Sequence, residues 1–578
     1  MTNSPAILLF AISIKILFCA AAAAAQDGAP VTINETQEWM FVGRPWHQTD
    51  DGEITVKTGP DRFHGEAAYD GQRCRNVDED LAFYKPQAYG DFEIEFDFRV
   101  GGAHGGAGLI YRAQDARHYY LLHFPSSGQH SRAKHFWAAI SMVDETGWVK
   151  IIKMDMIPGV PSETGLWRHV RFVVQGNTFR LWVNGRPFST VTDNTYSQPG
   201  LIGFESWDYG NTNARFRQVH IRGNTHQAPS WNDQIVPQQN WFLPSPEYDN
   251  GPWQRHMVSI ARGTRGDELL MTFNVKGEKE RPVIVRSQDD GRTWSKQELL
   301  PETPPFDNGI GVMLKTRDNR LIMHQGKNED TYIAESTDNG RTWTPPQKAT
   351  VDLEMPPWAT TGKVYTTSDV FELHDGTLLH FVGLFPRPEH WDIPDAKIID
   401  WGSHHSTALS CRSTDGGATW SRPVAIDGPP STGMHLDLTE CLAVELADNE
   451  LLCLVRPIYS AWCWEMRSSD GGVSWGPAVR APFVQYANAF FRTQSGVLLH
   501  AGRFPGLGLH VSRDDGMTWQ SYRIGTDTWA MGRMFEVQPN LVLYVYNDSW
   551  LGAMRAQFIR VTDEGIEPAM EMLPFQRP

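Results

Sequence analysis

Glu440 and Arg456 have opposite charges and lie sixteen positions apart in the segment TECLAVELADNELLCLVR. The segment holds two apolar, strand-like runs separated by Ala-Asp-Asn, a pattern typical of a β-hairpin. Such a hairpin returns Arg456 to the side of Glu440. A carboxylate placed there can act as a general base, and Arg can hold an anion through two parallel hydrogen bonds. The alternative is an ion pair with a purely structural role.

The hairpin lies within a region that contains an internal sequence repeat. The octapeptide Ser-x-Asp-x-Gly-x-Ser/Thr-Trp occurs five times, and Val561–Gly565 looks like a decayed sixth copy; the five begin at Ser287, Ser336, Ser413, Ser468 and Ser512. Such self-similarity is typical of β-propellers and other repeat proteins. Within each copy, Asp and Ser can bond amides of their own turn, and Gly supplies the open dihedral. These aspartates are therefore predicted to be structural rather than catalytic.

The octapeptides resemble the Asp boxes of the sialidase superfamily. The resemblance implies an all-β fold in which residues 251–578 form a six-bladed β-propeller, its sixth blade built from residues 529–569. The innermost strands of a propeller converge on a central mouth, where residues distant in sequence meet. In this family a Tyr activated by a Glu attacks the sugar, an Asp protonates the leaving group, and three Arg bind the substrate carboxylate.

The resemblance assigns roles to five residues of this chain. Glu440 corresponds to the activating glutamate and Arg456 to the second arginine. Arg255 falls where the first-blade arginine belongs, although the Pro of that motif is absent. The third arginine is Arg503 or Arg533, and we prefer Arg503. Together they predict an anionic substrate.

The general acid departs from the family pattern. Where sialidases carry Asp, this chain has Lys276-Gly-Glu-Lys-Glu-Arg281, so that Glu278 or Glu280 could serve. A solvated charged turn is the commoner meaning of such a run. Asp307 and Asp369, each just ahead of the inner strand of a blade, are the alternatives.

The nucleophile also departs from the pattern. The sixth blade starts with Trp529-Ala-Met-Gly-Arg533 where Tyr-Ser is expected, and Tyr544 and Tyr546 lie at the far end of the next hairpin. What remains is compatible with a hydrolase that uses Glu440 as base and another carboxylate as acid, or with no catalysis.

Residues 31–223 form a separate block of short strand-like runs. Phe92–Arg99 alternates with period two, and Asn184-Gly185 is a hairpin turn. The motifs GGAGLIYRAQDARHYYLLHF, LWVNGRPF and PGLIGFESW resemble concanavalin-A-like jelly rolls of laminin-G type, including the 3-keto-disaccharide hydrolase domains. The resemblance implies a jelly roll that holds the enzyme on a polymer. Residues 224–250, rich in Pro, Asn, Gln and Ser, are predicted to be a linker between two separable domains.

Composition limits the class of partner and the compartment. The net charge of −16 disfavours nucleic acid, which binds through Lys and Arg. Residues 1–25 are predicted to be a signal peptide cleaved near Ala25, so the protein is expected to be secreted or periplasmic, and no later segment predicts a membrane span. The five remaining cysteines favour buried thiols over a disulfide framework, and no metal or cofactor motif is present.

These observations predict a secreted, sialidase-like exo-glycosidase that removes terminal, anionic sugars from a glycan. One alternative is a catalytically inactive propeller that binds carbohydrate. Another places a 3-keto-disaccharide hydrolase or lyase activity in the N-terminal domain.

Overall fold

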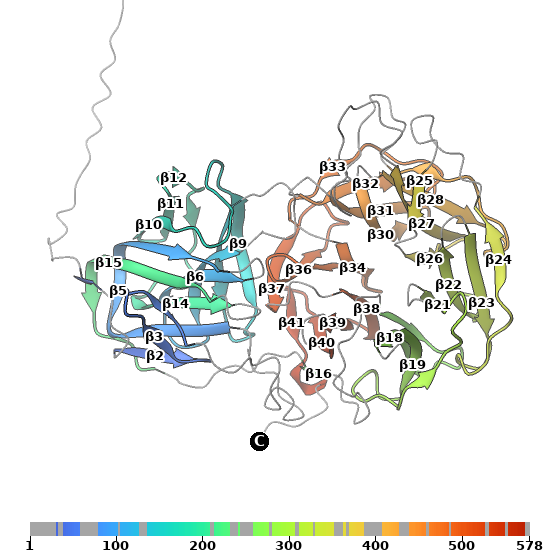
Figure 1. Cartoon of the computed structure of the whole chain (residues 1–578), viewed down its shortest axis with the longest axis horizontal. Helices are drawn as coiled ribbons and strands as arrows, with labels where there is room; N and C mark the ends of the chain where they lie inside the picture. Colours follow the sequence, from blue (N-terminus) through green and yellow to red (C-terminus); the bar gives the residue numbers. More distant parts are fainter. Residues whose placement is uncertain are drawn as a thin grey trace, which may run out of the picture.

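The computed structural model shows an all-β chain in two parts (Figure 1). It describes residues 31–32, 38–57, 79–101, 105–125, 136–207, 213–231, 241–242, 258–276, 280–306, 311–327, 330–351, 362–365, 369–386, 407–426, 438–457, 462–484, 487–525, 531–548 and 553–572. Within this part of the chain the helical segment is a single 3-10 turn, Met570–Met572. None of the described elements is a helix long and apolar enough to cross a membrane.

The N-terminal part is a two-layered β domain built around one long strand. Its strands are β1 (Val31–Thr32), β2 (Trp39–Val42), β3 (Trp46–Gln48), β4 (Ile54–Val56), β5 (Glu79–Arg99), β6 (Gly106–Ala113), β7 (Tyr119–Pro125), β8 (Trp137–Val143), β9 (Val149–Met156), β10 (Arg168–Gln175), β11 (Thr178–Val183), β12 (Arg186–Pro187), β13 (Val191–Thr192), β14 (Gly200–Trp207) and β15 (Arg215–His226). Strand β5 serves both layers, because its first residues pair with β14 and its last residues pair with β10 and β15.

The alternation predicted for residues 92–99 is confirmed. Phe92, Ile94, Phe96 and Phe98 are buried in one apolar cluster, whereas the acidic residues between them face outward to arginines on β10 and β15. Burying each of these side chains contributes about 1.5–3 kcal/mol to the stability of the fold. The domain is thus a two-layered β fold, and its jelly-roll strand order stays a prediction.

Five separate sheets make up most of the C-terminal part. They are β17 (Ser259–Arg262), β18 (Leu269–Lys276), β19 (Glu280–Ser287) and β20 (Glu298–Leu299); β21 (Val312–Lys315), β22 (Leu321–Lys327), β23 (Asp330–Ser336) and β24 (Gln347–Thr350); β25 (Gly362–Tyr365), β26 (Val370–Glu372), β27 (Leu378–Pro386), β28 (Thr407–Ser413) and β29 (Val424–Ala425); β30 (Leu438–Ala447), β31 (Glu450–Pro457), β32 (Trp464–Ser468) and β33 (Val479–Arg480); and β16 (Trp241–Phe242) with β38 (Met531–Gln538), β39 (Leu541–Asp548), β40 (Ala553–Val561) and β41 (Ile566–Pro568).

The prediction of six blades is therefore corrected, because the described part of the chain forms five blade sheets that stand alone. The remaining strands, β34 (Ala487–Arg492), β35 (Leu498–Gly502), β36 (Leu507–Ser512) and β37 (Gln520–Gly525), form an antiparallel meander. Its last strand pairs with β9, which merges the meander with the N-terminal domain in one 19-stranded sheet. A blade edge that would otherwise expose unpaired backbone groups is thus covered by another part of the chain.

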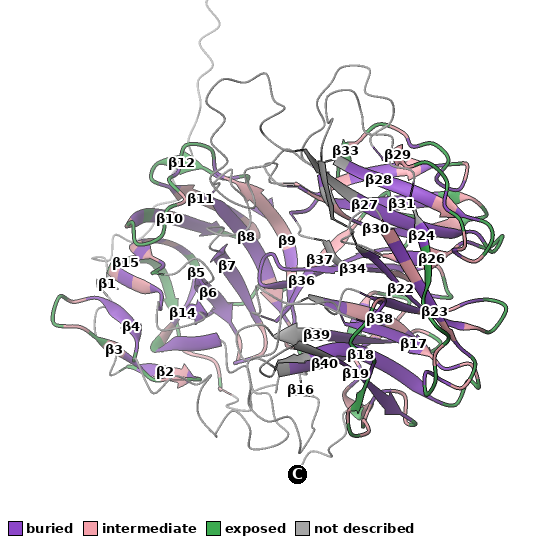
Figure 2. Ribbon diagram, turned by 45° about the vertical axis from the view of Figure 1, so that its right-hand side comes forward, coloured by how far each residue is buried: buried purple, intermediate pink, exposed green. Residues whose placement is uncertain are grey.

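The first strands of these units follow one another around a ring. Strand β17 contacts β21 and β38, β21 contacts β26, β30 contacts β27 and β34, and β34 contacts β38. Buried residues occupy the strands of the ring, and exposed residues gather in the turns at its rim (Figure 2). This is a propeller arrangement.

The Asp boxes are turns, as predicted. In the second box, Asp338 accepts hydrogen bonds from the Thr342 amide (2.8 Å), the Thr342 hydroxyl (2.6 Å) and the Ser336 hydroxyl (2.8 Å). These contacts, set against a raising effect of partial burial, lower the pKa of Asp338 to about 2. An aspartate engaged in this way holds no proton to donate near neutral pH.

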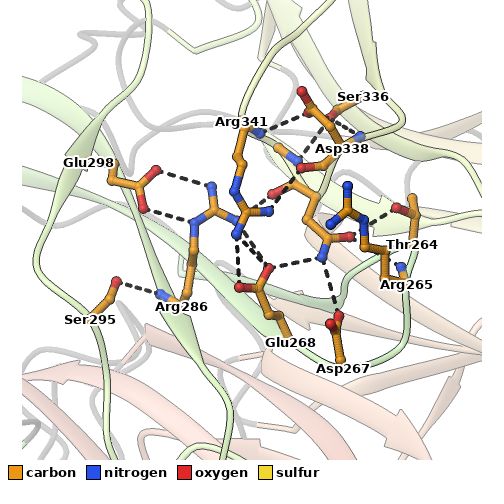
Figure 3. A network of polar contacts seen from close by, with 12 residues as sticks. Thr264, Arg265, Asp267, Glu268, Arg286, Ser295, Glu298, Ser336, Asp338 and Arg341 are labelled. Atoms are coloured by element: carbon orange, nitrogen blue, oxygen red, sulfur yellow. Dashed lines mark hydrogen bonds and ion pairs between the residues drawn. The ribbon is translucent and has the colours of Figure 1, made fainter.

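The same box is tied to the preceding blade through a buried acid (Figure 3). Glu268 precedes β18 and accepts hydrogen bonds from Arg341 (3.0 Å) and from the side-chain amide of Asn339 (2.9 Å). Arg286 lies 3.7 Å from the same carboxylate and also donates to the Asn339 carbonyl. The boxes therefore join neighbouring blades as well as closing their own turns.

Candidate active site

Five of the residues predicted to act on substrate lie at one end of the blade sheets, here called the mouth. Asp369 directly precedes β26, Glu440 lies at the start of β30 and Arg533 at the start of β38. Arg456 is near the end of β31, and Arg503 follows β35. In an antiparallel meander the start of a first strand and the end of the second strand share one end of the sheet. The Asp boxes, which follow the third strands, occupy the opposite end.

Glu440 and Arg456 form the ion pair that their spacing predicts. Arg456 Nη1 lies 2.9 Å from both Oε1 and Oε2 of Glu440. The β30–β31 hairpin brings them together, since Cys441 pairs with Val455 in its register. The side chains of Glu440 and Arg456 are 20% and 29% exposed, so the pair remains open to solvent. This is a carboxylate that a substrate could reach.

Asp369 and Arg533 form a second ion pair, with 3.1 Å between Arg533 Nη1 and Asp369 Oδ2. The two residues are 164 positions apart and come from different sheets. In the ring order, two blade sheets separate β26 from β38 in one direction, and one blade sheet and the β34–β37 meander separate them in the other. The pair therefore spans the centre of the ring, which is where a propeller places its ligand site.

Burial governs the proton affinity of Asp369. Removal from solvent raises its pKa, while the charge of Arg533 and the amide of Val370 lower it, and the pKa ends above its ordinary value. The side chain is 18% exposed and that of Arg533 is 12% exposed. A carboxyl group whose pKa is raised by its site is suited to hold and deliver a proton. Among the predicted acids, Asp369 is the one whose side chain lies within the described residues, and its role as the acid stays a prediction.

The other predicted site residues have mixed outcomes. Arg503 is 3% exposed and lies beneath the surface of the mouth. Glu280 begins β19, opposite Lys276 in the register, and its side chain lies outside the described residues. Arg255, Glu278 and Asp307 also lie outside the described residues.

The two tyrosines of the last blade sheet are not available to a substrate. Tyr544 and Tyr546 have 0% exposure, and their rings stack at 5.0 Å. They pack in an apolar cluster with Leu507 and Leu509 of the neighbouring meander. Neither can serve as the nucleophile without a large rearrangement.

Three buried polar residues near the mouth were not predicted. Asn274, Gln325 and Arg555 are 2%, 1% and 1% exposed and lie at the mouth ends of β18, β22 and β40. A signal was available, because each is a polar residue in a strand that also carries several large apolar residues. Buried polar groups need hydrogen-bond partners, so such a residue marks a built polar region.

Among the described residues, one group that could hold a metal lies away from the mouth. His374, Glu445 and Asp448 bring potential ligand atoms within 4.8 Å of one another, at the turn end of the β30–β31 hairpin, away from the mouth. Exposed acidic groups of this kind are common without an ion, and we assign no metal to them. The described cysteines are buried and form no disulfide with one another: Cys411, Cys441, Cys453 and Cys463.

Family models match both parts of the chain. Residues 31–222 match the model of a 3-keto-alpha-glucoside-1,2-lyase-like domain, and residues 320–525 match that of a BNR repeat-like domain. The resemblance of the two parts to these families is confirmed. No similar sequence was found among curated proteins.

Solved structures similar to the chain include sialidases. A Hadza microbial sialidase is 13% identical, with a TM-score of 0.42, and 82% of this chain covers 97% of it. The NanB sialidase of Streptococcus pneumoniae is 11% identical, with a TM-score of 0.37 and coverages of 81% and 94%. The alpha-L-arabinanase of Penicillium chrysogenum is 14% identical, with a TM-score of 0.40 and coverages of 56% and 98%. These values assign no activity to this chain.

Proposed function

We propose that the protein is a secreted, sialidase-like exo-glycosidase that hydrolyses terminal sugars of a glycan at the mouth of its propeller. The observation that carries the proposal is the Asp369–Arg533 pair at the centre of the ring, at the same end as the solvent-accessible Glu440–Arg456 pair. Acid–base cleavage of a glycosidic bond requires two carboxyl groups in different environments, and here each of them is paired with an arginine.

The different surroundings of Asp369 and Glu440 favour different catalytic roles for the two residues. Asp369, whose pKa is raised by burial, donates a proton to the leaving-group oxygen. Glu440 is more exposed and is held by Arg456. It acts as the general base that takes a proton from the attacking water. Arg533 keeps Asp369 at the centre of the ring and stabilises the carboxylate that forms when the proton leaves.

The arginines also support a prediction about the charge of the substrate. A guanidinium group has five N–H donors, so Arg456 and Arg533 can bind their carboxylates and still donate to a sugar. Arg503 lies buried at the same end, and the family resemblance assigns Arg255 to the first blade; together these arginines support the finer proposal of an anionic terminal sugar.

Two other functions have a specific observation in their favour. The burial of Tyr544 and Tyr546 favours a propeller that binds sugar without the Tyr chemistry of sialidases. The family match over residues 31–222 favours a lyase or hydrolase activity of the N-terminal domain.

A panel of aryl glycosides separates these possibilities. We expect the full chain to hydrolyse an aryl sialoside faster than neutral aryl glycosides, and Glu440→Gln to abolish that activity. Glu450→Gln is the matched control, since Glu450 lies in the same hairpin and is exposed. Equal activity of wild type and Glu440→Gln would show that the Glu440 carboxylate takes no part in catalysis. Sugar binding by calorimetry without turnover would favour the binding function, and preference for a neutral glycoside would overturn the anionic substrate.

A further inference from the structure

The two parts of the chain share a buried apolar interface. Trp148, in the N-terminal domain, belongs to the apolar cluster of the β34–β37 meander. Trp137 on β8 packs edge-on against Phe504 (5.7 Å between ring centres) and against Trp462 (5.3 Å). With the β9–β37 pairing, these contacts make a continuous core across the junction rather than a flexible hinge.

A buried arginine crosses this interface. Arg523 on β37 is fully enclosed, and its Nη2 lies 2.6 Å from Glu205 Oε1 and 2.9 Å from Glu79 Oε1. Glu205 belongs to β14 and Glu79 to β5, both in the N-terminal domain. The guanidinium carbon also lies 5.5 Å from the centre of the Trp207 ring. An acidic pair beside an indole ring is a favourable environment for a guanidinium group.

The strand beneath this pocket is shaped to leave room for it. A Cβ on Gly108 would lie 2.6 Å from Glu205 Oε2, and a Cβ on Gly106 would lie 2.2 Å from Trp207 Nε1. Glycine at both positions of β6 therefore lets Glu205 and Trp207 lie flat against the sheet. Trp207 Nε1 donates to His123 Nε2 (3.1 Å), which fixes the indole in place. The pocket is a built feature of the N-terminal domain.

Arg523 is the cation that the two acidic side chains of the pocket share. Burial, and next the charge of Arg523, lower the pKa of His123 well below its usual range, so the imidazole is neutral. Two acidic side chains therefore contact one guanidinium group in a site shielded from solvent. A buried charge that loses its partner is strongly destabilising. The N-terminal domain thus needs a cation at this position.

We propose that Glu79, Glu205 and Trp207 form a guanidinium-binding pocket of the N-terminal domain, and that Arg523 of the propeller is its built-in ligand. The bound Arg523 locks the two parts into one cooperative unit and closes this face of the domain to any other ligand. The inference is independent of the proposed glycosidase activity. It also opposes the sequence-based expectation of two separable domains, because cutting the linker leaves this interface intact.

Chemical rescue of Arg523→Ala in the full chain tests the pocket. We expect the variant to lower the Tm by at least about 3 °C in calorimetry, because one ligand of a buried pair is lost. Millimolar methylguanidinium should then restore the Tm in a saturable way, as a ligand that binds only the folded state does. The same concentration of tetramethylammonium should not, and the wild-type Tm should respond to neither. Arg513→Ala, at an exposed arginine of the same meander, is the control and should show no rescue.

Two further variants keep the test decisive. Arg523→Lys keeps the charge but cannot reproduce the planar fork, so its Tm should also fall. Glu205→Gln in the Arg523→Ala background should abolish the rescue. An unchanged Tm for Arg523→Lys, or equal rescue with and without Glu205, would overturn the proposal. If Arg523→Ala does not fold, a lowered Tm for both Arg523→Lys and Glu205→Gln supports the lock, and wild-type Tm values for both contradict it.

Discussion

Replacing Arg533 with Ala removes the cation that lies 3.1 Å from Asp369 at the centre of the ring. Two unit charges about 4 Å apart interact by about 4 kcal/mol at an effective dielectric constant of about 20. Removing one partner of a buried pair costs about 3–5 kcal/mol, because the remaining charge stays desolvated. Asp369 can escape part of that cost by taking up a proton, so we expect Arg533→Ala to lose about 2–4 kcal/mol of unfolding free energy at neutral pH.

The loss should depend on pH in a defined direction. Burial already raises the pKa of Asp369 in the folded protein, and removing Arg533 raises it further. The stability that such a group contributes is present at low pH and is lost as the pH rises through its folded-state pKa. The destabilisation caused by Arg533→Ala should therefore be small near pH 4 and largest near pH 8.

Urea unfolding of wild type, Arg533→Ala, Asp369→Asn and the double variant, near pH 4 and pH 8, measures both effects. We expect a coupling free energy of about 2 kcal/mol or more at pH 8, since the two residues share one buried contact. Arg533→Lys should recover part of it. A coupling below about 0.5 kcal/mol, or the same destabilisation at both pH values, would refute the reasoning.

Three further predictions follow from the described contacts. Asp338→Ala should cost about 1–2 kcal/mol of stability by urea unfolding, because it removes the acceptor of the Thr342 bonds. Because the pKa of Asp338 is lowered to about 2, its contribution in the wild type should be complete near neutral pH and decline progressively as the pH falls from about 4 toward 2. Gly108→Ala should lower the Tm by displacing Glu205, whereas Gly476→Ala, where the backbone is not left-handed and the nearest atom to a Cβ lies 3.4 Å away, should have a smaller effect; equal shifts would contradict the pocket geometry. Limited proteolysis between residues 232 and 240 should leave the two parts associated in size-exclusion chromatography, and their separation would contradict the interface.

The local features of this fold could be predicted from the sequence because short-range contacts determine them. Each Asp box carries its own donors and acceptors, so the turn around Asp338 needs only eight consecutive residues. The Glu440–Arg456 contact depends on a single hairpin, whose register follows from the turn between its strands. Both predictions are confirmed for this reason.

The long-range features could not be predicted in the same way. The Asp369–Arg533 contact arises only when the ring closes and brings together residues 164 positions apart. Both had been proposed separately, but nothing in their spacing indicates that they meet. The β9–β37 pairing, which changes the count of separate blade sheets, depends on the docking of two domains. Arg523 looks like one more polar residue of an edge strand until the glutamates of the other domain are placed beside it.

The dependence of hydrolysis on the leaving group tests the central claim most directly. We would measure kcat/KM for wild type, Asp369→Asn and Glu440→Gln with two aryl glycosides of the same sugar, one with a highly acidic phenol and one with a weakly acidic phenol. If Asp369 is the acid, Asp369→Asn should lose about 10²–10⁴-fold with the weakly acidic phenol, which needs protonation, and far less with the highly acidic one. Glu440→Gln should lose activity with both. Equal losses of Asp369→Asn on the two substrates, or wild-type rates for both variants, would contradict a carboxylate pair at the mouth.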